Sequence, residues 1–149
     1  MFERFDDAAR MVIIRAREEA DRFSHEALGT EHLLLGLIRG GDHVVLGALR
    51  RLGVSLDQVR SELERALAGP RKMETFEEIP FTPSAKRALE AAIGEATQRG
   101  LKSVRAEHLM LGLMIEGQSR AAKLLEAPGV SPESIRQELL RIREFLRLP

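Results

Sequence analysis

The chain has 149 residues, with 23 basic and 23 acidic side chains, so its formal net charge is zero. This balance lacks the excess positive charge that non-specific binding to nucleic acid or to an anionic membrane requires. The absence of cysteine excludes disulfide bonds, thiolate catalysis and Cys-ligated zinc. No apolar run is long enough to span a membrane and the first residues lack a signal-peptide pattern, so the expected location is the cytoplasm.

The sequence repeats itself at an offset of 76 residues, which aligns residues 5–67 with residues 81–143 without a gap. About 20 of the roughly 63 aligned pairs are identical, and the longest match joins residues 30–37 (TEHLLLGL) to residues 106–113 (AEHLMLGL). We predict two repeats joined by a surface connector at residues 68–80, which holds two prolines and mixed charge. Because each repeat alone would bury little surface, we expect the whole chain to form a single domain.

Four helices are predicted for the first repeat. In residues 8–23, apolar side chains recur at three- and four-residue spacing, with charged side chains on the other face. The next helix begins at Thr30 and ends near residue 40, and its leucine-rich turns are too uniformly apolar for a surface helix, which predicts a short, central, buried helix. Two amphipathic helices follow at residues 43–52 and 56–67.

The second repeat shows the same order. Thr82 and Pro83 supply a cap and a proline for a helix that runs to about Gln98. Two further helices are predicted at residues 119–127 and, after the cap Ser131, through residue 142. Strand signals are absent. The predicted fold class is all-α: two four-helix repeats, about eight helices in pseudo-twofold relation, around one shared core.

Four segments carry a resemblance to a known family: residues 1–5 (MFERF), 29–37 (GTEHLLLGL), 52–55 (LGVS) and 79–83 (IPFTP). The chain resembles the N-terminal domain of Clp-family AAA+ unfoldases, most closely the ClpC type, which is built from two Clp repeats. The resemblance implies a module above an ATPase ring that engages adaptor proteins and protein substrates for the unfoldase and its partner protease. Since the chain has no Gly-x-x-x-x-Gly-Lys-Ser/Thr loop, we predict no enzyme activity and no cofactor.

The repeated motif also suggests a ligand. A helix N-terminus favours anions, and Gly29 and Thr30 would present backbone N–H groups and a hydroxyl there. The adjacent Glu31 repels a plain phosphate but suits a ligand that carries a guanidinium beside its phosphate, such as phosphoarginine. Members of the resembled family read arginine-phosphorylated proteins at these motifs. The resemblance implies that Glu31 and Glu107 pair with the guanidinium and that Thr30 contacts the phosphate.

The second copy of the motif departs from this pattern. Arg105 and Ala106 stand where glycine and threonine are usual, so the hydroxyl and the flexible backbone approach are both lost, although Arg105 could still attract anions. We therefore expect the first repeat to bind phosphoarginine more tightly than the second. The alternative is that Thr30 and Glu31 only cap a buried helix.

A second surface follows from the resemblance alone. In that family, the region around the N-terminal phenylalanine and the Ile-Pro-Phe-Thr-Pro segment takes adaptors, which makes Phe2, Phe81 and Lys86 candidate peptide contacts. Burial in the core is the alternative for the phenylalanines, above all for Phe5 and Phe81, which are repeat-related. Phe76 has no such counterpart.

Other functions remain as alternatives. His32 and His108 lack the spacing of a metal site, so we expect them to be hydrogen-bonded within the core, and His25 and His43 to be ordinary surface or loop residues. We predict no metal, no nucleic-acid or membrane partner, and a monomeric isolated domain. The first alternative is a stand-alone Clp-repeat protein that acts as a decoy or regulator of such a system. The second, a helical regulator of nucleic acid, is disfavoured by the zero net charge.

Overall fold

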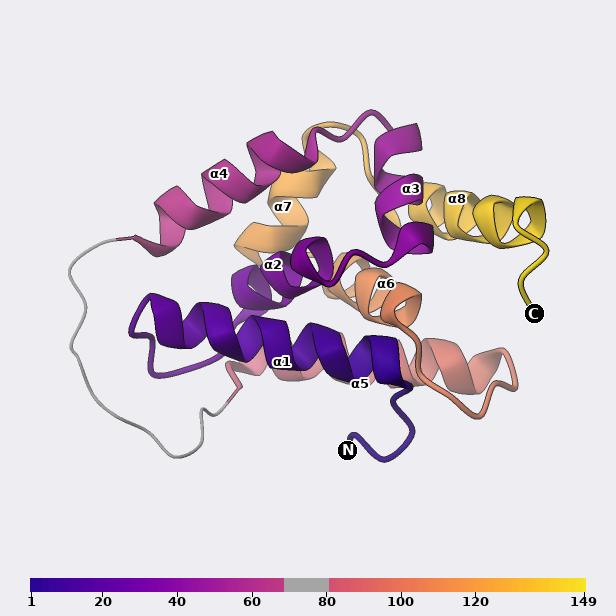
Figure 1. Cartoon of the computed structure of the whole chain (residues 1–149), viewed down its shortest axis with the longest axis horizontal. Coiled ribbons are helices and arrows are strands. Elements are labelled where there is room, and N and C mark those ends of the chain that lie inside the picture. Colours follow the sequence, from indigo (N-terminus) through magenta and orange to yellow (C-terminus); the bar gives the residue numbers. More distant parts are fainter. Residues whose placement is uncertain (69–80) are drawn as a thin grey trace.

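The computed structural model describes residues 1–68 and 81–149, so most of the predicted connector, together with Phe76, lies outside the described residues. The described chain is helical, without strands. The helices are α1 (Asp7–Arg22), α2 (Thr30–Gly40), α3 (His43–Arg51), α4 (Leu56–Leu67), α5 (Pro83–Gln98), α6 (Ala106–Glu116), α7 (Arg120–Glu126) and α8 (Pro132–Phe145) (Figure 1).

The helix boundaries follow the 76-residue offset, because the same local signals occur twice. Each of α5, α6 and α8 begins 76 residues after its counterpart α1, α2 or α4, and α7 begins within one residue of that offset from α3. Six helices have a side-chain cap, supplied by Asp6, Asp42, Ser55, Thr82, Ser119 and Ser131. Gly41 and Gly117 end α2 and α6 with φ of 70° and 69°, a conformation that glycine adopts without strain.

The two repeats exchange equivalent contacts, as a pseudo-twofold axis requires. An isolated bridge joins Phe5 to Val104, and its symmetry mate joins Leu28 to Phe81. Likewise, α3 of the first repeat packs against α8, while the related pair α7 and α4 also lie in contact. These reciprocal contacts confirm the predicted fold class of two intertwined four-helix repeats.

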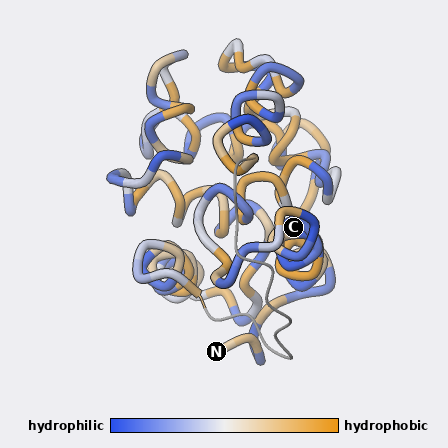
Figure 2. The backbone as a smooth tube through the Cα atoms, turned by 90° about the vertical axis from the view of Figure 1, so that its left-hand side faces the viewer, coloured by the Kyte–Doolittle hydropathy of each residue, from blue (hydrophilic) through white to orange (hydrophobic). Residues whose placement is uncertain are grey.

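The core is built around α2 and α6, which lie at the centre of the molecule (Figure 1). Every residue of α6 from Ala106 to Met114 is buried, as are Thr30 and residues 32–36 of α2 together with Leu37. The outer helices carry both hydrophobic and hydrophilic turns, as Figure 2 shows. The prediction of two short, buried central helices is confirmed.

The glycine within each motif allows the central helix to touch its neighbour. A Cβ on Gly36 would lie 2.5 Å from the carbonyl oxygen of Val12, and a Cβ on Gly112 would lie 2.2 Å from that of Ala88. Real Cβ atoms do not approach backbone oxygen so closely. Glycine is therefore required at these positions by the close packing of α1 on α2 and of α5 on α6.

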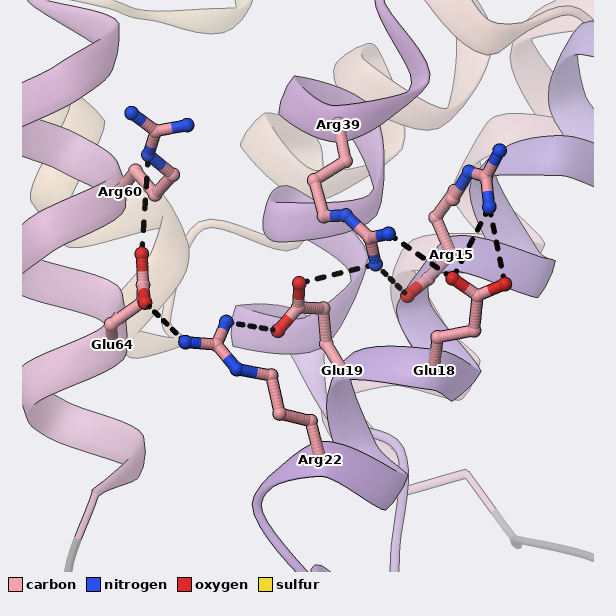
Figure 3. A network of polar contacts seen from close by, with 7 residues as sticks. All are labelled: Arg15, Glu18, Glu19, Arg22, Arg39, Arg60 and Glu64. Atoms are coloured by element: carbon pink, nitrogen blue, oxygen red, sulfur yellow. Dashed lines mark hydrogen bonds and ion pairs between the residues drawn. The ribbon is translucent and has the colours of Figure 1, made fainter.

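A glutamate that occurs at the same position in both repeats forms ion pairs that hold helices together. Glu19 is buried, and its two carboxylate oxygens pair with Arg22 and Arg39, each at 3.2 Å (Figure 3). Its counterpart Glu95 pairs with Arg136 at 2.5 Å. A buried carboxylate is tolerated when it is paired and hydrogen-bonded. We assign these two glutamates to helix packing, which explains why both repeats have them.

Candidate functional site

The two motifs lie at the helix N-termini that have no side-chain cap, those of α2 and α6. In each, a histidine at the third position accepts the N–H of the cap residue: His32 Nδ1 from Gly29, and His108 Nδ1 from Arg105, both at 2.8 Å. Both imidazoles are 3% exposed. The histidines are thus hydrogen-bonded within the core, as expected, and they leave the N–H groups of the first turn without a capping side chain.

His25, expected to be an ordinary surface or loop residue, lies in the loop before α2 but is buried. Its Nδ1 lies 2.6 Å from His32 Nε2, and its Nε2 lies 3.1 Å from the carbonyl oxygen of Leu67. Because His32 accepts the Gly29 N–H through Nδ1, neutral His32 carries its proton on Nε2 and donates it to His25, which in turn donates to Leu67. These hydrogen bonds connect the first motif to the end of α4.

The first motif opens into a pocket of about 780 Å³. Thr30 is buried and donates its hydroxyl to Glu31 Oε1 at 2.9 Å, whereas Glu31 is only half-buried. The second repeat contributes Thr82 from the cap of α5 and Arg120 from α7. A half-exposed carboxylate, an uncapped helix N-terminus and an arginine therefore line the same pocket.

The second motif is arranged differently. Glu107 is 6% exposed, and its Oε1 lies 2.9 Å from Arg143 Nη1 and 3.4 Å from Arg105 Nη1. Burial raises the pKa of Glu107 above its ordinary value, although the two guanidinium groups oppose that shift. Arg105 and Arg143 also donate to the backbone oxygen of Pro149. The carboxylate predicted to pair with an external guanidinium is thus paired with guanidinium groups of its own chain.

The difference between the two motifs lies in the side chains. Gly29 and Arg105 have nearly the same extended backbone, with φ of −105° and −103°. A Cβ on Gly29 would meet the nearest atom, in Thr82, at an ordinary 3.5 Å. Neither copy uses a conformation reserved for glycine, and the expected loss of a flexible approach to the backbone at Arg105 stays a prediction.

The candidate peptide-binding residues are partly brought together. The ring of Phe2 lies 5.0 Å from that of Phe5 and 5.7 Å from that of Phe81, measured between centroids. Phe5 is buried, while Phe2 and Phe81 are half-buried. Lys86 lies exposed on the first turn of α5. Since Phe81 directly precedes Thr82, this aromatic cluster adjoins the pocket of the first motif.

Sequence reasoning missed two arginines at these sites, Arg120 and Arg143. Both stand opposite an apolar residue in the other repeat, Val44 and Leu67 respectively, so the repeat comparison gave no reason to select them. The mismatch itself was the available signal, because an arginine in place of a buried leucine marks a position where the repeats differ in chemistry.

Within the described ranges, residues 1–68 and 81–149, no group of three or more histidine and carboxylate side chains is placed to hold a metal ion. None of the helices described there is both long and apolar enough to cross a bilayer.

These observations define an all-α domain of two intertwined helical repeats with a pocket beside each repeated motif. The motif glutamate is half-exposed in the first repeat and paired with two arginines in the second. The family model for the Clp repeat (R) N-terminal domain matches residues 4–128 and 81–146. The chain belongs to this family, and it matches the N-terminal domain of ClpC-type ATPases.

Similar proteins agree with this assignment. The chloroplastic chaperone ClpC1 of Oryza sativa subsp. japonica is 44% identical over 142 residues, covering 95% of this chain but 15% of that protein. The N-terminal domain of ClpD from Arabidopsis thaliana has a TM-score of 0.74 at 26% identity, covering 97% of both chains. A ClpV N-domain in complex with a VipB peptide shares the fold, with a TM-score of 0.71 at 15% identity, over 91% of this chain and 84% of that one.

Proposed function

We propose that this domain is a recognition module that binds adaptor proteins and marked protein substrates for an ATP-dependent Clp unfoldase and its partner protease. Its family membership supports the proposal, since the chain spans about 15% of the length of the ClpC relatives and matches their N-terminal domain. A ClpV N-domain of the same fold has been solved with a bound peptide. The half-buried Phe2 and Phe81, with the exposed Lys86, are the proposed adaptor surface.

The observation that carries the proposal is the half-exposed carboxylate of Glu31 at the uncapped N-terminus of α2. A guanidinium can pair with this carboxylate. A phosphate group attached to that guanidinium can accept hydrogen bonds from the N–H groups of the first helical turn and lie near Arg120. Phosphoarginine carries both groups. We therefore propose that the first motif, Gly29, Thr30 and Glu31, reads arginine-phosphorylated proteins.

The hydroxyl of Thr30 has a defined part in this proposal. In the structure it donates to Glu31, which holds the carboxylate against the helix N-terminus. When a guanidinium takes over the pairing with Glu31, the hydroxyl becomes available to donate to a phosphate oxygen. The second motif has Ala106 at the equivalent position and cannot make this exchange.

Titration calorimetry with free phosphoarginine tests the proposal. We expect one site per wild-type chain and a loss of about tenfold or more in affinity for Glu31→Gln, because the variant keeps the size of the side chain but removes the charge that pairs with the guanidinium. Glu26→Gln, an exposed acid of the same pocket, is the matched control and should bind like the wild type. Unchanged affinity in Glu31→Gln would sink the proposed role of this residue.

A further inference from the structure

The second motif holds an arginine of its own chain in the position where a ligand guanidinium would lie. Arg143, on the last turns of α8, is 18% exposed in its side chain and contacts the carboxylate of Glu107 at 2.9 Å. Arg105 contacts the same oxygen at 3.4 Å. The buried carboxylate therefore faces two guanidinium groups of its own chain.

Within residues 1–68 and 81–149, no arginine is paired with the glutamate of the first motif. The residue that corresponds to Arg143 at the 76-residue offset is Leu67, which lines the same pocket as Glu31. A leucine side chain cannot pair with a carboxylate, so the residue at this position leaves Glu31 accessible to a ligand. The repeats thus place an arginine and a leucine at one equivalent position, beside one equivalent glutamate.

We propose that Arg143 is an internal guanidinium ligand of Glu107 that closes the second motif to arginine-bearing ligands. Guanidinium and carboxylate pair with high geometric specificity, and a tethered side chain competes at an effective concentration of about millimolar or more. An external ligand must displace Arg143, leaving a guanidinium that is now partly buried and unpaired. The second site is therefore built but self-occupied.

Both arginines also contact Pro149. Arg105 and Arg143 donate to its backbone oxygen. Leu148 and Pro149 line the pocket beside Glu107. In a variant without Arg143, Arg105 would remain to pair with a phosphate. It would take the part that the threonine hydroxyl has in the first motif, where the second motif has Ala106.

The test is Arg143→Leu, which copies Leu67 into the second repeat. Phosphoarginine, whose choice as the probe rests on the proposed function, is titrated by calorimetry at about pH 8, because the raised pKa of Glu107 makes an alkaline buffer favour its carboxylate form. We expect the number of binding sites to rise by one per chain, and Arg143→Leu combined with Glu107→Gln to lose the added site. Arg141→Leu, an exposed arginine on the same helix, is the matched control and should add no site.

The two proposals fail separately. One outcome is that the wild type binds no phosphoarginine, while Arg143→Leu gains a site that depends on Glu107. In that case the closure by Arg143 stands and recognition at the first motif is wrong. If a folded Arg143→Leu variant gains no site, the closure is overturned. Arg143→Gln, which has a shorter polar side chain without the charge, provides the same comparison should the leucine variant melt below the titration temperature.

Discussion

Gly112→Ala should lower the melting temperature of the domain by about 5–10 °C, the effect of a loss of about 2–3 kcal/mol in unfolding free energy. The added Cβ would lie 2.2 Å from the carbonyl oxygen of Ala88 and 2.9 Å from the backbone nitrogen of Ala92. Neither backbone atom can rotate away, so α5 and α6 must separate and lose packing along their whole contact. This loss exceeds the gain of about 1 kcal/mol that alanine brings to a helix.

The matched control is Gly94→Ala in the middle of α5. A Cβ on Gly94 meets no atom within 4 Å, so only the gain in helix propensity remains and this variant should melt slightly above the wild type. Thermal unfolding followed by far-UV circular dichroism compares the two variants. A Gly112→Ala protein as stable as the wild type would show that the two helices do not pack at the distance described.

His108 should make the domain sensitive to acid. Burial, with a smaller contribution from the charge of Arg105, lowers its pKa from 6.5 to about 4. The unfolded chain therefore binds this proton more readily than the folded one, so stability falls as the pH drops from about 6.5 towards 4. The expected loss of unfolding free energy from this single group is about 3 kcal/mol over that interval.

The comparison that isolates this contribution is wild type against His108→Asn. Asparagine does not titrate, and its side-chain oxygen can accept the Arg105 N–H that His108 Nδ1 accepts at 2.8 Å. Urea unfolding at a series of pH values should show the stability difference between the two proteins shrinking, or reversing, as the pH falls to about 4. A difference that stays constant with pH would contradict the lowered pKa.

Much of the fold could be predicted because its signals are local or repeated. The caps Thr82 and Ser131, the prolines that follow them and the apolar character of the two central helices are properties of a few neighbouring residues. The 76-residue offset then predicted that the second half would repeat the first. Packing of α3 on α8 and of α4 on α7 could not be read from either signal, since it depends on how the two repeats meet.

The motif glutamates have the same sequence neighbours in both repeats but different surroundings in the structure. Glu31 was selected from its own neighbours, and the structure places it in an open pocket. Glu107 has the same neighbours but a different environment, because Arg143 arrives from a helix 36 residues further along the chain. His25 was missed for the same physical reason: its partners His32 and Leu67 come from two other elements. Contacts between distant segments decide what a repeated motif can bind.

The most direct test of the central claim, recognition at the first motif, is an NMR titration that follows individual backbone amides of the domain as phosphoarginine is added. The amide signals of Gly29, Thr30 and Glu31 should shift progressively and saturate, while those of Arg105 and Glu107 stay in place. Saturating shifts at Arg105 and Glu107, with the first motif unmoved, would contradict the account.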